Sequence, residues 1–306
     1  MKEHEPSVDL YAVVVWFNPN SKTIEFWNQL AMLLPLVVVD NTPSVNKIYS
    51  SRQIANARLY IDNGDNLGIA KALNQGLEFG LKGKSDQELK RTWCIQFDQD
   101  SRIEHSVLMK MKEAAEAASE KTAAIAPSYY ETNVGRVAPA IRVKPFHIVK
   151  ITPIGERPIL ASYVISSGCV INLYAANVIG LHDESLFIDF VDIEWGLRAS
   201  SLGFKIWLLP TVKMTHCLGD NPVKLGNVKL PNHSPIRHYY YFRNVLLMVR
   251  KPFVPISWKV VELAKLPVRF IIYALFTKCK TQQIKSMFNG FIDGVKGKSG
   301  KFISTN

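Results

Sequence analysis

Four short apolar runs, rich in β-branched residues, recur through the first hundred residues and alternate with segments of helical periodicity. The apolar runs are YAVVVWFN, PLVVVDN, ARLYIDN and TWCIQFDQD, at residues 11–18, 35–41, 57–63 and 92–100. Apolar residues three and four positions apart mark the segments 21–34, 68–81 and 105–121. Strands that alternate with helices pair in parallel, with helices on both faces of the sheet. The sequence therefore predicts an α/β fold built on a doubly wound, mostly parallel sheet.

The second half of the chain has a different composition. Residues 122–172 contain more Pro and Gly and several short strand-like runs, which predict a small mixed sheet beside the main one. A short helix is expected around 174–180, and the strand-like runs FKIWLLP and TVKMTH follow later. From about Ser234 the chain is helical, aromatic and basic. We therefore expect a C-terminal helical, basic region after the α/β body.

Positive charge is concentrated near the C-terminus. The formal net charge is +11, and residues 242–306 carry twelve Lys and Arg against Glu262 and Asp293. Large apolar residues are interleaved with basic ones in segment 258–277. This pattern predicts a helix lying on an anionic membrane surface; packing on the body, or on another subunit of a homo-oligomer, is the alternative. The apolar face is too large for an arm that follows nucleic-acid phosphates, so no nucleic acid is expected as a partner.

Three features bear on the cellular compartment. The chain has four widely separated cysteines, typical of reduced thiols and not of a disulfide framework: Cys94, Cys169, Cys217 and Cys279. The N-terminal MKEHEPSVDL lacks the apolar core of a signal peptide. Charged residues and a proline interrupt segment 260–277, whose apolar part is shorter than the ~20 residues that a membrane span needs. We expect a cytoplasmic protein.

Polar side chains follow each of the four predicted strands. They are Asn18, Asp40, Asn41, Asp62, Asn63, Asp98 and Asp100. Ligands of open α/β sheets bind at the carboxyl ends of the strands, although Asn and Asp also end strands because they favour turns. Neither G-x-G-x-x-G nor G-x-x-x-x-G-K-[ST] is present, so a dinucleotide fold and a P-loop NTPase are not supported. In FDQDS, Asp98 and Asp100 point the same way and suit Mg²⁺ or Mn²⁺ on a diphosphate.

Several motifs occur in an order that resembles glycosyltransferase family 2, the inverting enzymes with the GT-A fold, and within it the bacterial rhamnosyltransferase-like branch. The resemblance covers roughly residues 9–250. It rests on FNP, VVDN, NGDNLGIAKALNQG, FDQDS, SSGCVIN, FIDFVDIEWGLRASSLGFKI and THCLGD. It implies an N-terminal tail over 1–8, a GT-A catalytic domain over 9–235 and a possibly membrane-associating region over 236–306. Within the catalytic domain, 9–121 would form the nucleotide-binding half and 122–235 the acceptor half.

The acidic stretch 187–199 matches the acceptor side of the family's sugar pocket. The resemblance implies that Asp192 is the catalytic base, that Glu194 is the following acidic position and that Arg198 closes the motif. The position before the base, often acidic in relatives, is Val191 here, which puts the acceptor contacts in doubt. Burial would raise the basicity of Asp192. On a helix, Glu194 and Arg198 stand four residues apart and can form an ion pair. The alternative interpretation of the stretch is an amphipathic helix whose acidic first turn is stabilised by the helix dipole, and this explains Asp189 at least as well as an acceptor contact.

Further residues take their roles from the same resemblance. A divalent ion would be held by Asp100 and His216. The nucleotide sugar would contact Phe17, Asn18, Asp40, Asn41, Asn66, Gly68, Lys71, Asp98 and Gln99; the helix start at 69–71 would help to hold phosphate. The acceptor or sugar pocket would contain Gly168, Asp189, Glu194, Trp195, Arg198, Arg237, Tyr240 and Arg243. Gly168 would allow a close backbone approach there.

The resemblance implies transfer of L-rhamnose from dTDP-β-L-rhamnose to a lipid-linked oligosaccharide at the inner face of the cell membrane, in O-antigen or capsule biosynthesis. A UDP-sugar donor, for instance for galactofuranose, stays open. A sugar-nucleotide pyrophosphorylase would carry a glycine- and arginine-rich loop after the first strand, where this chain has WFNPNS. A non-catalytic membrane-bound subunit is the other alternative.

Overall fold

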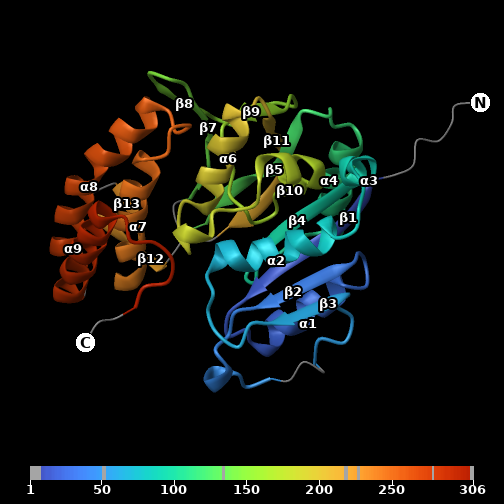
Figure 1. Cartoon of the computed structure of the whole chain (residues 1–306), viewed down its shortest axis with the longest axis horizontal. Coiled ribbons are helices and arrows are strands. Elements are labelled where there is room, and N and C mark those ends of the chain that lie inside the picture. Colours follow the sequence, from blue (N-terminus) through green and yellow to red (C-terminus); the bar gives the residue numbers. More distant parts are fainter. Residues whose placement is uncertain are drawn as a thin grey trace, which may run out of the picture.

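The computed structural model describes residues 8–49, 53–132, 135–216, 220–225, 228–277 and 279–303 (Figure 1). The side chains of 216, 220–225 and 228–232 lie outside this description. In the described residues, nine strands form one main sheet in the order β3-β2-β1-β4-β10-β5-β11-β9, and β6 (Arg136–Val137) pairs with β5. The first four strands are parallel to one another: β1 (Asp9–Trp16), β2 (Leu36–Asp40), β3 (Leu59–Asp62) and β4 (Thr92–Asp98).

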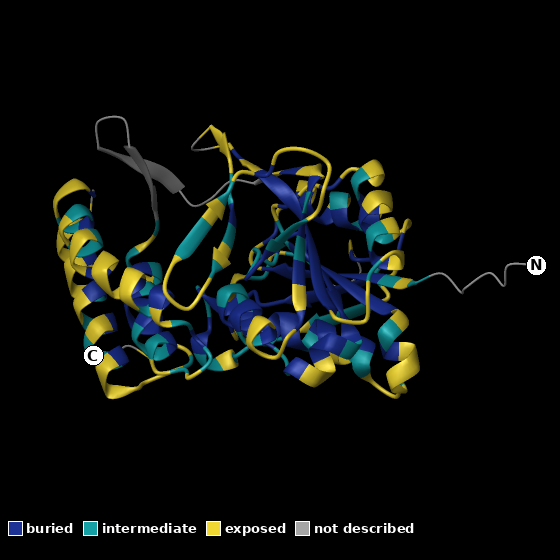
Figure 2. Ribbon diagram, turned by 90° about the horizontal axis from the view of Figure 1, so that it is seen from above, coloured by how far each residue is buried: buried dark blue, intermediate teal, exposed yellow. Residues whose placement is uncertain are grey.

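Both faces of this parallel half are covered by helices. Successive residues of a strand point to opposite faces, so Val13 and Val15 of β1 enter one core and Val14 and Trp16 enter the other. The helices are α1 (Ser21–Leu30), α2 (Ile69–Leu81), α3 (Asp86–Arg91), α4 (His105–Glu116), α5 (Leu173–Ile179) and α6 (Val191–Ser201). Trp27 of α1 belongs to the second core. The predicted doubly wound α/β architecture is confirmed; β1, β2 and β4 are largely buried (Figure 2), whereas β3 at the edge of the sheet is only partly buried.

The strands of the second half mainly continue the main sheet. They are β5 (Thr122–Glu131), β9 (Ile159–Ala161), β10 (Val170–Asn172) and β11 (Lys205–His216), and they make this half mixed. The separate small sheet is the ribbon of β7 (Ala140–Val143) and β8 (Ile148–Ile151); a second ribbon joins β12 (Asp220–Leu225) to β13 (Val228–Asn232). The two runs FKIWLLP and TVKMTH lie in one strand, whose register shifts between Leu209 and Lys213.

Three helices form the C-terminal part: α7 (Pro235–Val249), α8 (Ile256–Phe276) and α9 (Lys280–Lys296). They lie together at one end of the molecule (Figure 1). A third core joins them to the start of α6, where Phe190 and Val191 pack with Phe242, Met248 and Trp258. Across the described part of the chain, none of the helices has the length and apolarity to cross a bilayer. The C-terminal part therefore packs directly against the segment that carries the acidic motif.

Candidate active site

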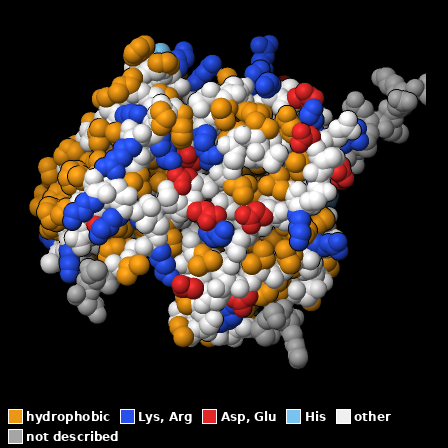
Figure 3. Space-filling view, in the orientation of Figure 1, with side chains coloured by type: hydrophobic (Ala, Val, Ile, Leu, Met, Phe, Trp, Pro, Cys, Tyr) orange, Lys and Arg blue, Asp and Glu red, His pale blue; other side chains and the backbone are white. Residues whose placement is uncertain are grey.

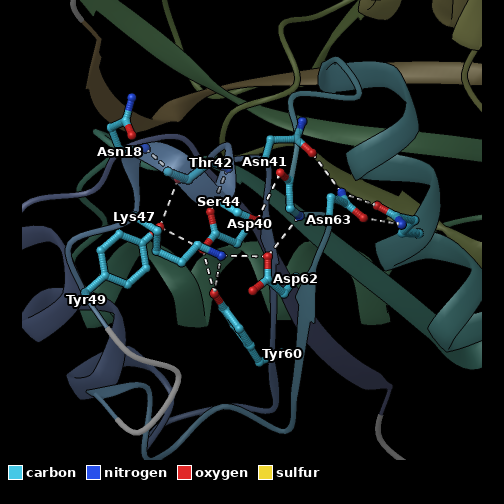
Figure 4. Close-up of polar contacts among 12 residues, drawn as sticks. Asn18, Asp40, Asn41, Thr42, Ser44, Lys47, Tyr49, Tyr60, Asp62 and Asn63 are labelled. Atoms are coloured by element: carbon cyan, nitrogen blue, oxygen red, sulfur yellow. Dashed lines mark hydrogen bonds and ion pairs between the residues drawn. The ribbon is translucent and has the colours of Figure 1, made fainter.

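The carboxyl ends of β1, β2 and β3 bring most of the predicted polar residues to one edge of the sheet (Figure 4). Asp40 ends β2 and is buried there. Its Oδ2 accepts hydrogen bonds from the hydroxyls of Tyr49 (2.7 Å) and Tyr60 (2.5 Å), and its Oδ1 accepts from the backbone N–H of Thr42 (2.9 Å). Burial raises the pKa of Asp40, but these hydrogen bonds outweigh it and hold the pKa below its usual value. Asp40 is thus an ionised anchor for the loop 42–49.

Lys47 supplies the positive charge beside Asp40. Its Nζ lies 3.1 Å from Asp40 Oδ2 and 2.6 Å from Asp62 Oδ1. Tyr49 Oη is also 2.9 Å from the hydroxyl of Thr42, which accepts the N–H of Asn18 at 2.7 Å. This network links the ends of all three strands.

A second chain of contacts consists of side-chain amides. Asn63 donates to Asn41 Oδ1 (2.8 Å) and to Gln75 Oε1 (2.9 Å), and Gln75 returns a bond to Asn63 Oδ1 (2.8 Å). Asn41 donates to the carbonyl of Gly68 at 3.0 Å. Asn66 Oδ1 accepts the N–H of Gly68 at 3.0 Å. These amides fix the start of α2 to the ends of β2 and β3.

The FDQDS turn at the end of β4 is held from the side of β1. Gln99 Oε1 accepts the N–H of Phe17 (2.8 Å), and Gln99 Nε2 donates to the Phe17 carbonyl (3.0 Å). The indole N–H of Trp27 donates to the Gln99 carbonyl at 3.0 Å. Asp98 is half-buried and Asp100 is exposed. The turn therefore presents Asp100 to solvent from a fixed backbone.

The start of α2 differs from the expectation of a phosphate site. Its first N–H groups point at a carbonyl of the protein: Ile69 N donates to Phe187 O at 2.8 Å, and Ala70 N approaches the same oxygen at 3.4 Å. Lys71 Nζ pairs with Glu184 Oε1 at 3.2 Å. Gly68 has φ +87°, and a Cβ there would lie 2.6 Å from Phe187 O. These donors are used within the protein because loop 184–187 lies over the helix start.

Asp192 lies on the first turn of α6 and is half-buried. Desolvation raises the pKa of Asp192 to about 6; hydrogen bonds from the backbone oppose this, and the negative charges of Asp189 and Asp98 add to it. Its carboxylate borders a void of about 10 Å³ that is also lined by Cys169 and His182. Burial thus raises the pKa of Asp192, as was expected for a carboxylate that acts as a base.

His182 is a buried neighbour that sequence reasoning missed. Its Nε2 lies 3.1 Å from Gln96 Nε2 on β4, and burial lowers the pKa of His182 to about 3, so the ring is neutral. Its backbone N–H donates to Asn74 Oδ1 at 2.9 Å. His182 thus connects β4 and α2 beneath Asp192, and a lone histidine in a loop gives no sequence signal for this.

The rest of the DIEWGLRA motif is internal structure. Glu194 is buried and pairs with Arg198 through two bonds of 3.1 and 2.9 Å, as predicted from their spacing. Arg198 also donates to the carbonyls of Ile179 and Leu181, both at 2.7 Å. The indole of Trp195 donates to the Gly180 carbonyl at 2.9 Å. These three side chains hold α6 against α5 and have little surface left for an acceptor.

The predicted acceptor residues of α7 divide into two groups. Arg237 is partly exposed and its Nε lies 3.1 Å from Asp189 Oδ1. Tyr240 is buried; its ring stacks on Phe187 with centroids 4.9 Å apart, and its hydroxyl accepts the N–H of Phe302. Arg243 is only 1% exposed and faces backbone carbonyls. Arg237 and Asp189 therefore border the solvent side, whereas Tyr240 and Arg243 support the loop from inside.

Two further predicted residues lie elsewhere on the main sheet: Gly168 just before β10, and His216 at the end of β11. Gly168 has φ +70°, and a Cβ there would lie 2.7 Å from Met214 Sδ and 2.9 Å from Tyr129 Oη. The close approach that requires this glycine is thus made by the protein's own side chains. His216 ends β11, but its side chain lies outside the described residues.

The donor set at the end of β4 fits a hard divalent cation in part. Asp98 and Asp100 supply carboxylate oxygens of the kind that Mg²⁺ and Mn²⁺ prefer. In the portion of the chain that is described, no group of three or more His, Cys, Asp or Glu is arranged as a complete metal site. The two carboxylates are compatible with an ion that also takes oxygens from a diphosphate.

Sequence reasoning also missed the loop between β2 and β3. Lys47 and Tyr49, with Tyr60 on β3, complete the environment of Asp40. The available signal was the triplet KIY, which lies in the loop between two strands whose polar ends were already expected to bind a ligand. Asn244 was missed as well, because an asparagine inside an apolar helix is not distinguished from a satisfied core residue.

One relative of known activity matches the sequence over nearly its whole length. No established family profile matches the chain. The chain is 31% identical over 303 residues to "dTDP-rhamnosyl transferase RfbF" of Shigella flexneri, a match that covers 95% of this chain and 97% of that protein.

Solved structures show the same fold at low identity. S. aureus TarS 1–349 superposes with a TM-score of 0.55 at 16% identity and covers 94% of this chain and 81% of its own. GalNAc-T7, crystallised with UDP, GalNAc and Mn²⁺, gives 0.52 at 13% identity; 95% of this chain matches 56% of that one. The fold is therefore that of GT-A glycosyltransferases. Because the chain is 31% identical to the Shigella protein over nearly the whole length of both, it belongs to the rhamnosyltransferase family.

Proposed function

We propose that this glycosyltransferase moves L-rhamnose from dTDP-β-L-rhamnose to a lipid-linked saccharide, with inversion at the anomeric carbon. The donor is supported by the full-length relation to a dTDP-rhamnosyl transferase. The chemistry is supported above all by one observation, the half-buried carboxylate of Asp192 with a pKa near 6. The acceptor would belong to surface polysaccharide assembly, as O-antigen or capsule.

Asp192 serves as general base in this proposal. Inversion requires an acceptor hydroxyl to attack from the side opposite the nucleoside diphosphate and to lose its proton as it does so. A carboxylate with a pKa near 6 is ionised at neutral pH and still basic enough to take that proton in the transition state. Asp189 and Arg237, which form an ion pair beside it, would contact the acceptor.

The nucleotide would lie across the ends of β1, β2 and β4. Phe17, Asn18 and Asn41 line this edge, and Asp98 and Gln99 stand at the end of β4. Asp40, Gly68 and Lys71 would act through neighbours, because their polar groups already bind Tyr60, Asn41 and Glu184. Asn66 would support the edge through its bond to Gly68.

Mg²⁺ or Mn²⁺ would be held by Asp100, with Asp98 beside it and His216 as the third residue. When bound, the ion would neutralise charge on the diphosphate leaving group. Asp98 already acts on Asp192 through its negative charge. The same turn would thus serve the nucleotide and the base.

We further propose that α8 and α9 attach the enzyme to an anionic membrane at the inner face of the cell. Apolar side chains of both helices are more than half exposed: Val260, Val268, Ile271, Leu275, Phe288 and Val295. Figure 3 shows hydrophobic side chains gathered over this end of the molecule, with Lys and Arg beside them. Apolar contact combined with basic charge is what an anionic interface attracts. We place the catalytic domain at 9–235 and this attachment region at 236–306.

A calorimetric titration with dTDP and with UDP, each with and without Mg²⁺, tests the site and the donor together. We expect metal-dependent binding that favours dTDP, and a loss of at least about tenfold in affinity for Asp100→Ala. Asp86→Ala, an exposed carboxylate change on α3, is the matched control and should bind as the wild type does. A preference for UDP would replace the rhamnosyl donor by a UDP-sugar. If neither nucleotide binds with metal present, the proposed site is wrong.

A further inference from the structure

Most carbonyls of the loop that leads to Asp192 face donors from outside the loop. Three of its carbonyls lie within hydrogen-bonding distance of one side-chain nitrogen, Asn244 Nδ2 of α7: Leu186 O at 2.9 Å, Ile188 O at 2.7 Å and Asp189 O at 3.1 Å. Arg243 Nη2 donates to Leu186 O at 3.0 Å and reaches Ser185 O at 3.3 Å. The carbonyl of Phe187 accepts from the start of α2, and that of Phe190 accepts the N–H of Glu194 in α6.

The amide of Asn244 has a defined orientation. Arg243 Nε can only donate, and it lies 2.9 Å from Asn244 Oδ1. The oxygen of the amide therefore faces Arg243, and the NH₂ group faces the loop. Asn244 is 0% exposed, so water does not compete for these donors. The carbonyl of Gly300 accepts from Arg243 Nη1 at 2.5 Å and fixes the guanidinium from the other side.

The loop needs this support because its backbone is strained. Phe187, Asp189 and Phe190 all have positive φ, of +64°, +62° and +66°. At Phe187, φ +64° and ψ −62°, with a 2.8 Å bond from Ile188 N to Leu186 O, make a γ-turn of the rare strained kind. Such conformations persist only where surrounding groups hold them, and they concentrate at functional sites. Without the donors of α7, this loop would relax.

We propose that Asn244 and Arg243 are positioning residues for the glycosyl transfer: they hold loop 185–190 in its strained form and so set Asp192 at the reacting centre. The inference rests on the proposed role of Asp192 as base. It gives the C-terminal helices a part in catalysis that is separate from membrane attachment. Neither residue touches the substrates; both act through the loop and the helix that it starts.

Asn244→Leu tests the proposal with little change in volume, since leucine has nearly the shape of asparagine, removes both donors and adds no charge near Asp192. We expect kcat for acceptor-independent hydrolysis of dTDP-β-L-rhamnose to fall about tenfold to a hundredfold, with KM within about twofold. As the loop relaxes, Asp192 gains water, so its pKa and the acid limb of the kcat profile should move down by about half a pH unit or more. Carboxyl ¹³C NMR follows the pKa of Asp192 directly, with Asp192→Asn to assign its signal.

Asn289→Leu makes the same chemical change on the neighbouring α9 and should leave kcat, KM and the pKa of Asp192 unchanged. Arg243→Lys provides a second variant if Asn244→Leu does not fold, because it keeps the charge but loses the bond that orients the amide, and it should lower the pKa of Asp192 as well. An unchanged pKa of Asp192 in a folded Asn244→Leu protein would overturn the proposal, even if activity fell. Wild-type activity in Asp192→Asn would instead reject the proposed base and leave the NMR result to decide the role of Asn244.

Discussion

At the scale of one residue, Asp192 shows what it costs to desolvate the carboxylate that we propose as the base. Its side chain is partly desolvated, which makes it a better base and makes its ionised form unfavourable in the folded protein. Asp98 on β4 and Asp189 on the preceding loop add negative charge, while His182 is neutral. The structure therefore retains a destabilising charge where the proposed chemistry needs one.

Asp192→Asn should separate these two effects. Because the pKa of Asp192 is raised to about 6, the folded state holds a proton that the unfolded state releases between about pH 4 and 6, and stability falls as pH rises through that window. At pH 7.5 the neutral amide should therefore raise the free energy of unfolding by about 1–3 kcal/mol, a gain that disappears below about pH 4. Activity should fall about 10²- to 10⁴-fold.

Urea denaturation at pH 7.5 and pH 3.5, beside a pH profile of kcat/KM, measures both effects. Asp86→Asn on the exposed first turn of α3 is the control: it should leave the rate unchanged and lower stability by no more than about 1 kcal/mol, opposite in sign to the gain expected at Asp192. If the variant is inactive but no more stable than wild type at pH 7.5, contacts in the folded protein already compensate for the desolvation of ionised Asp192. That result would contradict the destabilisation expected from its burial.

At the scale of elements, the start of α2 is where local pattern and tertiary structure diverge. The sequence NLGIAK favours a helix N-terminus with free N–H groups, and the helix forms as predicted. Those groups meet the carbonyl of Phe187, more than a hundred residues away in the chain. The helix start thus supports the strained loop, and Gly68 is required there because a side chain would collide with Phe187.

Two glycines with positive φ allow this collision to be isolated. Gly68→Ala should cost more than about 3 kcal/mol in unfolding free energy, since strain at φ +87° adds to a contact of 2.6 Å with backbone. Gly83→Ala, at φ +73° with open space around it, should cost only about 1–2 kcal/mol. Urea denaturation measures the unfolding free energy of both variants. Equal losses of stability would mean that the contact with Phe187 does not exclude a side chain at position 68.

The same contrast explains how much the sequence could predict. The strands β1 to β4 and helices α1, α2 and α4 follow from apolar patterning, and the Glu194–Arg198 pair follows from their spacing on a helix. The partners of Asp40, Lys71 and Gly168 do not, because each is contacted by a residue that is remote in the chain or across the sheet. Residue type and strand position indicate an active edge, whereas only the fold decides which side chains face a substrate and which face each other.

For the molecule as a whole, the C-terminal helices have two different faces. One face packs on α6 and its loop through Phe242, Met248 and Trp258. The opposite face exposes a stripe of apolar residues, with Val268 56% and Ile271 57% accessible, in a region of strong positive charge. A face of this kind is covered either by lipid or by a second copy of the chain, and the basic residues favour lipid with anionic headgroups.

Flotation with phosphatidylglycerol-containing vesicles tests this at the scale of the whole protein. We expect wild type to float with anionic vesicles, to float weakly with phosphatidylcholine alone and to dissociate as salt approaches about 0.5 M, where charge attraction is screened. Val268→Glu with Ile271→Glu should abolish flotation and leave dTDP binding intact. Val178→Glu with Leu202→Glu, both 50% exposed on the body, is the matched control and should float normally. If wild type stays with the dense fraction and sedimentation shows a dimer that the first pair of changes dissociates, the stripe is a subunit interface and the membrane proposal fails.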